Sequence, residues 1–446
     1  MARWGIVGGG MLGMTLALRL AQSGEPVELF ESESAVGGLA GAWMIGDQPW
    51  DRHYHVTLLS DRRLRALLAE LGLASEIEWK QSRTAFYTGG RLYSMSNAIE
   101  FLKFPPLRLI DKLRLGATIL HASRLRDWRP LEKIRAVDWL RSWSGERTTE
   151  RIWIPLLRAK LGDNYERVSA AFIWATIARM YGARRSGMKR EMFGYVRGGY
   201  ARVLPAMAQL LEKSGVIIHR NAKVQSVRKG SDGKIAVALE NGPAMVFDQA
   251  VITLPPRGAA KLCDQLSETE KQALRNVEYQ GIVCASALMK KPLAGYYVTN
   301  ITDEGIPFTA VIEMTALVDR EHFAGYTLIY LPKYVAEGHA VFAMSDEQIR
   351  ETFLNALGRM YPALDQKDVV AFQVSRVGSV FAIPTLDYSR NLPSMSTSIP
   401  GLHLVNSSHI VNGTLNVNET IQLAENTVPS LLAGMNAGGR AAHAPA

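Results

Sequence analysis

The feature that most constrains the fold of this chain is a glycine-rich turn between two short apolar runs near its start. Residues 4–7 are apolar, and Gly8, Gly10 and Gly13 follow at once in the spacing GxGxxG. Apolar residues then recur at helical spacing, and a second apolar run, 26–30, comes next. The order of strand, glycine turn, helix and strand predicts a βαβ unit that binds a dinucleotide, rather than a βαβ unit without a ligand.

Each residue type in this unit has a physical task. Gly8 allows the tight turn, Gly10 lets the backbone approach a pyrophosphate, and Gly13 lets the helix pack closely on the strand. The start of the helix offers free N–H groups and the positive end of its dipole to phosphates. Glu31 ends the second strand, 18 residues after Gly13, where its carboxylate can accept hydrogen bonds from ribose hydroxyls.

A second glycine pair, Gly37-Gly38, follows six residues after Glu31. With it the chain resembles the flavoprotein family of amine oxidases, protoporphyrinogen oxidases and carotenoid or phytoene desaturases, which carries GxGxxG, a glutamate and then a glycine pair. The spacing alone indicates a dinucleotide, and the resemblance implies that this dinucleotide is FAD. It also implies an FAD-dependent oxidoreductase that transfers a hydride from an apolar or lipid-linked substrate to non-covalent FAD. Neither cysteine, Cys263 or Cys284, lies near the C-terminal motif where a thioether link would form.

The resemblance implies that the cofactor domain returns twice later in the chain. A helix is predicted from Tyr200, and a buried strand at 250–254 is stopped by two prolines. A further strand is predicted at 401–406, followed by a helix from near Asn418 toward Leu432. We therefore predict an α/β fold, a Rossmann-like FAD-binding domain with an inserted α+β substrate domain. The expected segments are the FAD-binding domain at 1–59, 191–258 and 396–437, a helical, basic first part of the substrate domain at 60–190, its second part at 259–395, and a flexible tail at 438–446.

The resemblance also suggests which residues touch the cofactor. It places the adenine end near Val224 and the flavin near the C-terminal helix. After the last strand the family commonly has Gly-Asp, whereas this chain has Asn406-Ser407, and turn or cap chemistry is the alternative for Asn406 and Asn418. The expected cofactor contacts are Gly8, Gly10, Met11, Leu12, Gly13, Glu31, Ser32, Gly38, Leu39, Ala40, His53, Val224, Thr253, Asn406, Asn418 and Thr420.

Candidate catalytic side chains come from three places. His53 and His55 flank Tyr54 in a stretch that reaches the flavin in the resembling family, and they suit acid–base or phosphate-binding roles; ordinary hydrogen bonding is the alternative. No further residues are placed to complete a metal site, so we expect no metal. Arg158, with Lys160 two residues on, lies in a segment resembling the W-x-P-L-L-x-x-K pattern of related substrate domains. Arg158 and Lys160 are both candidates to bind an anionic group, and a helix with solvated basic positions is the alternative.

Two observations concern the second substrate segment. Glu313 interrupts the mostly apolar stretch 308–314 and is predicted to face a cavity; Arg376 is a weaker candidate of the same kind. Amine oxidases of the resembling family carry a lysine on a long strand that corresponds here to 281–288. This stretch contains no lysine, which argues against the usual amine-oxidising arrangement.

The charge balance and one basic stretch bear on partners. The 446 residues carry a formal net charge of +9, which favours acidic partners without choosing among them. Between 101 and 133, leucines and phenylalanines alternate with Lys103, Arg108, Lys112, Arg114, Arg124, Arg126 and Arg129. Such an amphipathic stretch lies either in a core or on the inner face of an anionic membrane, and related proteins contact the membrane here. No nucleic-acid recognition motif accompanies it, and nothing in the sequence sets the oligomeric state.

We expect a cytoplasmic protein that is at most peripheral to the membrane. The sequence shows no secretory signal and no apolar run of about 18 residues, and its two cysteines form no metal-binding pattern. Two other functions stay open. One is a non-redox flavoenzyme similar to UDP-galactopyranose mutase, which acts on a sugar nucleotide and carries a histidine-bearing loop like 53–55. The other is a non-catalytic FAD-bound interaction protein. The sequence identifies neither the substrate nor the electron acceptor.

Overall fold

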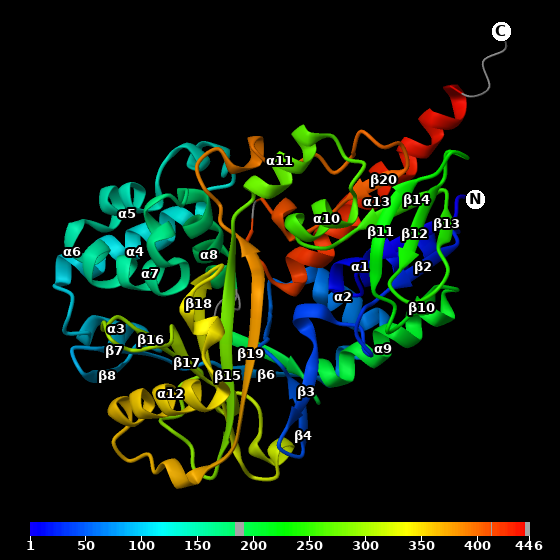
Figure 1. Ribbon diagram of the computed structural model, residues 1–446. Helices are drawn as coiled ribbons and strands as arrows, with labels where there is room; N and C mark the ends of the chain where they lie inside the picture. The colour runs from blue at the N-terminus through cyan, green and yellow to red at the C-terminus, as the bar shows by residue number, and fades with distance from the viewer. Residues whose placement is uncertain (183–190, 412, 442–446) are drawn as a thin grey trace.

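The computed structural model describes residues 1–182, 191–411 and 413–441, and a five-stranded parallel sheet forms its cofactor half. The strand order is β10-β2-β1-β14-β20, which draws together three distant parts of the chain, as Figure 1 shows. β1 and β2 are the strands predicted on either side of the glycine turn. The strands are β1 (Trp4–Val7), β2 (Val27–Phe30), β10 (Ile217–His219), β14 (Gln249–Ile252) and β20 (Leu402–Leu404).

Alternate residues of these strands enter two different cores, as the period of a strand requires. Ile6 and Leu29 face a layer of helices, whereas Val7 and Phe30 face a small antiparallel sheet. The helical layer contains α1 (Met11–Gln22), α2 (Arg62–Glu70), α9 (Tyr200–Lys213) and α13 (Val417–Ala441). The opposite layer contains β11 (Val224–Lys229), β12 (Ile235–Leu239), β13 (Met245–Phe247), α10 (Pro256–Leu262) and α11 (Glu268–Asn276).

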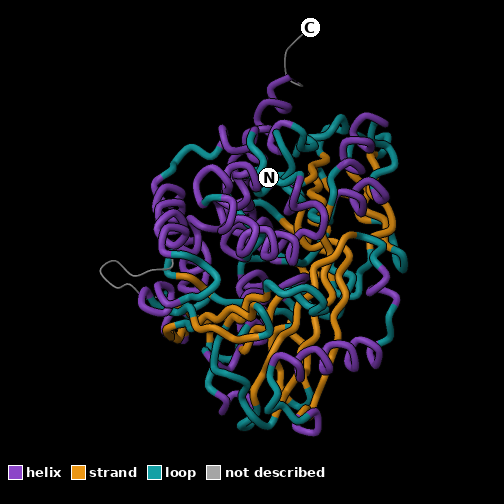
Figure 2. The backbone as a smooth tube through the Cα atoms, turned by 90° about the vertical axis from the view of Figure 1, so that its left-hand side faces the viewer, coloured by secondary structure: helices purple, strands orange, loops and turns teal. Residues whose placement is uncertain are grey.

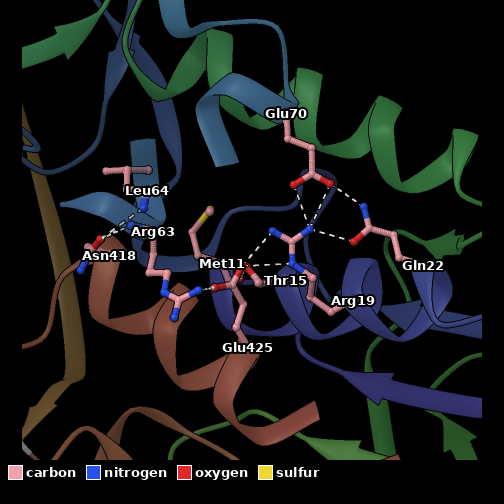
Figure 3. Close-up of polar contacts among 9 residues, drawn as sticks. All are labelled: Met11, Thr15, Arg19, Gln22, Arg63, Leu64, Glu70, Asn418 and Glu425. Atoms are coloured by element: carbon pink, nitrogen blue, oxygen red, sulfur yellow. Dashed lines mark hydrogen bonds and ion pairs between the residues drawn. The ribbon is translucent and has the colours of Figure 1, made fainter. Parts of the chain in front are cut away.

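Charged side chains join three of the helices in the first layer (Figure 3). The guanidinium of Arg19 on α1 pairs with Glu425 on α13 at 2.9 Å and with Glu70 on α2 at 2.8 Å. Arg63 on α2 reaches the other oxygen of Glu425 at 3.0 Å. The network therefore ties the helix that follows the glycine turn to the C-terminal helix.

A seven-stranded sheet with the order β19-β15-β18-β17-β16-β7-β8 forms the other half. Helix α12 covers one face of it, and the β3–β4 hairpin and a small β5-β9-β6 sheet pack near the other. Its strands are β7 (Thr84–Thr88), β8 (Arg91–Ser94), β15 (Tyr279–Met289), β16 (Val298–Ile301), β17 (Ala310–Glu313), β18 (Thr327–Ala336) and β19 (Val369–Ala382). The remaining elements named here are β3 (Ala42–Ile45), β4 (Gln48–Asp51), β5 (Thr57–Leu58), β6 (Ile77–Gln81), β9 (Met192–Val196) and α12 (Asp346–Met360).

A group of helices with its own core completes this half. Figure 2 shows the helices of the molecule mainly in the upper part of the view and the strands mainly in the lower part. The group consists of α3 (Ala98–Lys103), α4 (Leu109–Arg124), α5 (Ala136–Ser144), α6 (Glu146–Thr148), α7 (Ile154–Leu161) and α8 (Ala170–Gly182), and a π-helical turn, Thr149–Trp153, joins α6 to α7. Phe381 and Ile383, at and just after the end of β19, enter the same core, so the helices are anchored to the large sheet.

Two of the predicted segment boundaries differ from the structure. The predicted substrate segment 60–190 begins with α2, but Leu64, Leu67 and Leu68 form an apolar stripe that packs in the core of the cofactor half. The predicted cofactor segment 191–258 begins with β9, which pairs with β5 and β6 instead of the five-stranded sheet. In both cases long-range packing of a short element decides its place.

Two predicted helical stretches also differ. The stretch 101–133 is not one helix, because Pro105 and Pro106 separate α3 from α4 and prevent a continuous ladder of hydrogen bonds. The C-terminal helix, predicted to run toward Leu432, continues to Ala441, so the helix includes the first part of the predicted flexible tail. The last five residues of that tail, 442–446, lie outside the described residues.

The packing of α2 against the cofactor half can be tested by truncating one leucine. Leu67 is fully buried, so Leu67→Ala leaves a cavity and is expected to destabilise the protein by about 2–5 kcal/mol. Denaturant unfolding followed by flavin fluorescence measures the loss. The matched control is Leu113→Ala on α4, where the side chain is 61% exposed and a change within about 0.5 kcal/mol is expected. Equal destabilisation by both changes would contradict this packing.

Candidate functional site

A single cavity of about 1290 Å³ extends from the glycine turn of the cofactor half into the second half. One end is lined by backbone and small side chains and the other by aromatic and apolar side chains. The first end contains Val7, Gly8, Gly9, Gly10, Met11, Leu12, Glu31, Ser32, Glu33, Gly37, Gly38, Leu39, Ala40, Val224 and Thr253. We call this end the nucleotide end.

The glycine turn is held by backbone packing too tight for any side chain. Gly8 has φ +110°, which an L side chain rarely adopts, and its carbonyl accepts a hydrogen bond from the Thr253 hydroxyl at 3.2 Å. A Cβ on Gly13 would lie 1.9 Å from the same carbonyl oxygen. Gly13 therefore brings α1 close to β1, as predicted, and it does not line the cavity. The Gly37 N–H donates to the Gly9 carbonyl at 2.8 Å, which joins the two glycine loops.

The start of α1 is suited to a diphosphate. Gly10 is its N-cap residue and no side chain caps the first turn, so the N–H groups there remain available to an anion. A Cβ on Gly10 would meet only the Gly38 Cα, at 4.0 Å, among the described residues. The space beside Gly10 is therefore open, and Met11 and Leu12 line the cavity next to it.

The Glu31 carboxylate is fixed at the end of β2. It is buried, and its Oε2 accepts the Gly9 N–H at 3.0 Å. Its Oε1 accepts the Ser32 hydroxyl at 3.1 Å and the Glu33 N–H at 2.9 Å. A carboxylate held in this way has lone pairs left to accept ribose hydroxyls. The residues present thus fit a dinucleotide.

The C-terminal candidates are split by the structure. Asn406 does not line the cavity; its Oδ1 accepts the Ser408 N–H at 3.1 Å, and its neighbour Ser407 lines the cavity instead. Asn418 does line it, but its Oδ1 caps the start of α2 by accepting the N–H groups of Arg63 and Leu64 (Figure 3). Thr420 lines the cavity. Asn406 is thus a turn residue rather than a lining residue, because the short side chain bonds within its own turn.

The two histidines differ sharply in their surroundings. Burial, with a smaller contribution from His55, lowers the pKa of His53 to about 4, so its ring is neutral. Its Nδ1 donates to the Leu39 carbonyl at 3.3 Å, and its Nε2 then accepts from the Ser375 hydroxyl at 3.1 Å. Both ring nitrogens are occupied, so His53 orients the Leu39 loop at the cavity wall and has no nitrogen left for proton transfer.

His55 is backed by a buried carboxylate. Its Nδ1 lies 3.3 Å from Asp51 Oδ2, and the other oxygen of Asp51 accepts the Tyr200 N–H at 2.6 Å. His55 lines the cavity. Because the Nδ1 of His55 makes no hydrogen bond among the described residues, whereas both ring nitrogens of His53 are occupied, His55 is the histidine suited to acid–base work.

The far end of the cavity, which we call the substrate end, was not predicted from the sequence as a unit. It is lined mainly by aromatic and apolar side chains from both halves: Tyr54, Val56, Leu58, Met180, Phe193, Tyr200, Ile282, Tyr297, Val298, Ile312, Tyr334 and Val380. Its polar lining includes Lys160, Arg179, Asn300 and Ser379. No sequence signal marks Arg179 or Tyr334, because only the return of the chain through α8 and β18 brings them here.

Three predicted positions lie outside the cavity lining. The Arg158 side chain is half exposed, bonds to the Tyr165 hydroxyl at 3.2 Å and pairs with Glu304. The buried Glu313 carboxylate accepts the N–H groups of the loop at 293–295 rather than facing a cavity, and burial raises its pKa. Arg376 pairs with Asp346. These three side chains bind other parts of the protein, whereas Lys160, on the same helix as Arg158, lines the cavity.

The described residues contain neither a metal-binding cluster nor a membrane-spanning helix. No group of three or more His, Cys, Asp or Glu side chains among them is arranged to hold a metal ion. No helix in the described part of the chain is long and apolar enough to cross a membrane. Strand β15 spans the stretch without lysine and is buried along its whole length.

Comparison with known proteins decides the family. The model of the family described as "Flavin containing amine oxidoreductase" matches residues 12–422. The chain belongs to this family. The predicted family and fold are thereby confirmed, and the chain is placed among oxidoreductases. Because the family contains a flavin and the nucleotide end fits a dinucleotide, the cofactor is FAD, as the sequence predicts.

Individual relatives are distant. A probable zeta-carotene desaturase of Synechococcus elongatus is 24% identical over 248 residues, covering 50% of this chain and 51% of its own length. A coproporphyrinogen III oxidase of Mycobacterium bovis is 25% identical over 292 residues, covering 61% of this chain and 63% of its own. The chain thus spans about half the length of the first curated relatives it matches.

Solved structures share the fold over nearly the whole chain. An oxidoreductase from Methanosarcina mazei has a TM-score of 0.74 at 18% identity, covering 96% of this chain and 100% of that one. Reduced UDP-galactopyranose mutase has a TM-score of 0.74 at 13% identity, covering 97% and 96%. At such identities the likeness shows the fold alone.

Gly10→Ala tests whether the open space beside Gly10 is the diphosphate site. The backbone at Gly10, with φ −72°, suits alanine and the new Cβ meets no close neighbour, so the apoprotein should keep its melting temperature. The Cβ would displace the diphosphate, and FAD affinity should fall about tenfold or more. Titration of apoprotein with FAD measures the affinity. The control, Gly358→Ala in α12, also has open space; it should leave FAD affinity unchanged and, because alanine favours a helix, should not lower the melting temperature. Unchanged FAD affinity in Gly10→Ala would reject this site.

Proposed function

We propose that this protein is an FAD-dependent oxidoreductase that oxidises a largely apolar small molecule. One observation carries the proposal: the nucleotide end and the aromatic and apolar substrate end belong to one cavity. A molecule held in the substrate end lies beside the position of the flavin. FAD, when bound, accepts a hydride there.

The chain's own residues supply positioning and proton transfer. Tyr54, Tyr297 and Tyr334 line the substrate end; Tyr297 is buried and the other two are partly buried, and their rings limit the access of water to the reacting centre. The Tyr54 and Tyr334 hydroxyls bond to each other at 2.8 Å, which fixes two of the aromatic walls. His55, held by Asp51, is placed to take a proton from the substrate as the hydride leaves.

The names of relatives support substrates of this kind. The matched proteins include desaturases named for zeta-carotene and 15-cis-phytoene and oxidases named for coproporphyrinogen III. The alternative is a non-redox enzyme similar to UDP-galactopyranose mutase, favoured by the shared fold. A sugar nucleotide needs many hydrogen-bonding partners, and the mostly apolar substrate end offers few. Oxidation is therefore preferred.

Anaerobic mixing separates the two functions. We expect coproporphyrinogen III, zeta-carotene or phytoene to bleach the visible absorbance of the oxidised flavin, because hydride transfer reduces it. Dithionite serves as the control that the flavin can be reduced. UDP-galactopyranose added to the reduced protein should remain unchanged. Isomerisation of the sugar nucleotide without net change in flavin redox state would establish the alternative instead.

We infer that the protein also rests on an anionic membrane surface through α3 and α4, which we call the apolar–basic face. Ile99, Leu102, Leu109, Ile110, Leu113 and Leu120 are exposed, several by more than half. In Figure 1, α3 and α4, which carry these residues, lie on the left of the molecule, and the five-stranded sheet lies on the right. Exposed Lys103, Arg108, Arg124 and Arg126 accompany it. Apolar side chains among basic ones match an anionic lipid surface.

The alternative of a core-packed amphipathic helix holds only for the other face of α4. Leu115, Thr118 and Ala122 are buried there. Lys112, one of the basic positions in the sequence pattern, is buried as well, and its ammonium donates to the Leu102 carbonyl at 2.6 Å. This bond holds α3 against α4 and contributes nothing to the exposed charge.

Vesicle sedimentation tests the apolar–basic face. Wild-type protein should sediment with phosphatidylglycerol-containing vesicles and less with neutral ones, because both apolar insertion and charge contribute. Ile110→Glu combined with Leu113→Glu should abolish sedimentation while FAD content is unchanged. The control, Val246→Glu, alters an exposed apolar residue on the cofactor half. Equal sedimentation of all three proteins would exclude this membrane contact.

A further inference from the structure

We propose that the substrate end of the cavity recognises a carboxylate on an otherwise apolar substrate, and that Lys160 is the residue that binds it. This inference rests on the proposed function, because it names the substrate class of the same site. The proposed site prefers acidic substrates to neutral hydrocarbons, although the apolar walls alone would accept both.

The position of the Lys160 ammonium is the first observation. Lys160 lies on α7 and lines the cavity. Its Nζ lies 5.4 Å from the centre of the Phe381 ring, 5.6 Å from that of Tyr334 and 5.9 Å from that of Phe172. Three ring faces stabilise a cation, so the ammonium is held in place although the site is largely apolar.

The second observation is the absence of a neutralising partner. Apart from its three ring contacts, the Lys160 ammonium has no ion pair and no hydrogen bond with the described residues. The other cation of the substrate end, Arg179, is already paired with the buried Asp61 at 3.0 Å. Among the described residues, the substrate end therefore carries one uncompensated positive charge. A partly buried cation without a partner is costly unless a ligand supplies the opposite charge.

The chemistry of the ligand follows from this arrangement. One ammonium is a single point charge with three donors, which matches one carboxylate rather than a sugar diphosphate with two charges. The rest of the substrate must be apolar or aromatic, since tyrosines and aliphatic residues form the surrounding walls.

The ammonium is charged at neutral pH. Burial, with a smaller effect of Arg179, lowers the pKa of Lys160 to about 8. The groups that face it are Arg179 on α8, Tyr334 on β18 and, beyond it, Tyr54. Burial raises the pKa of Tyr334 to about 12 and that of Tyr54 above its ordinary value. Lys160 is therefore the group that loses its proton as the pH rises past about 8.

The experiment compares two probes that share the same apolar pyrene group and alkyl chain. Pyrenebutyrate and pyrenebutanol differ in their head group alone, and each is titrated into the FAD-loaded full chain while quenching of pyrene emission by the flavin is followed. We expect the acid to bind about tenfold or more tightly than the alcohol. This preference should weaken above pH 8, where Lys160 becomes neutral.

Three variants assign the preference to Lys160. Lys160→Met keeps the length and apolar stem and should remove the preference for the acid without weakening the alcohol. Lys160→Arg keeps the charge and should retain it. Arg158→Met removes a charge from the same helix outside the cavity and should leave the preference intact. Equal affinities for acid and alcohol in the wild type, or an unchanged ratio in Lys160→Met, would overturn the proposal.

The outcome is separable from that of the proposed function. The visible spectrum of each purified variant records FAD content, and its melting temperature records folding. A protein that holds FAD and shows no preference for the acid rejects the carboxylate site alone. A protein that takes up no FAD rejects the proposed function itself.

Discussion

The structure depends on the close approach of backbone to backbone around the glycine turn. Because Gly13 has no side chain, α1 starts directly against β1, with the Gly8 carbonyl where a Cβ would otherwise lie. The same approach leaves open space beside Gly10 and brings the loop of Gly37 and Gly38 into contact with the turn. We propose that the diphosphate of FAD lies in this open space, beside the N–H groups at the start of α1.

A second interaction joins elements of the two halves beside the cavity. The buried carboxylate of Asp51 accepts the Tyr200 N–H at the start of α9 and backs His55. The carbonyl of the same residue accepts the Tyr330 hydroxyl of β18 at 2.6 Å. One residue at the end of β4 thus joins the cofactor helices, the large sheet and the histidine that faces the cavity. Asp51 therefore links the position of the His55 ring to the packing between the two halves.

The two ends of the cavity carry different kinds of positively charged or hydrogen-bond-donating groups. Backbone N–H groups at the nucleotide end suit the diphosphate, whereas at the substrate end the Arg179–Asp61 pair is internally balanced and Lys160 is not. Aromatic rings rather than carboxylates surround this ammonium. A ring face stabilises a cation without neutralising it, so the substrate end keeps its charge for a ligand.

The sequence by itself determined the elements that are formed by residues close together in the chain. The spacing of Gly8, Gly10 and Gly13, with Glu31 after them, meets the requirements of one turn, one helix and two strands. The structure contains β1, α1 and β2 in the predicted order. Only the tertiary structure decided the substrate end. Lys160, Arg179 and Tyr334 lie on α7, α8 and β18 and meet because distant segments pack together. Arg158 and Lys160 are two residues apart, yet one side chain faces outward and the other faces the cavity. Residues two apart on a helix point in different directions, and packing, which one sequence does not reveal, selects which of them meets the substrate.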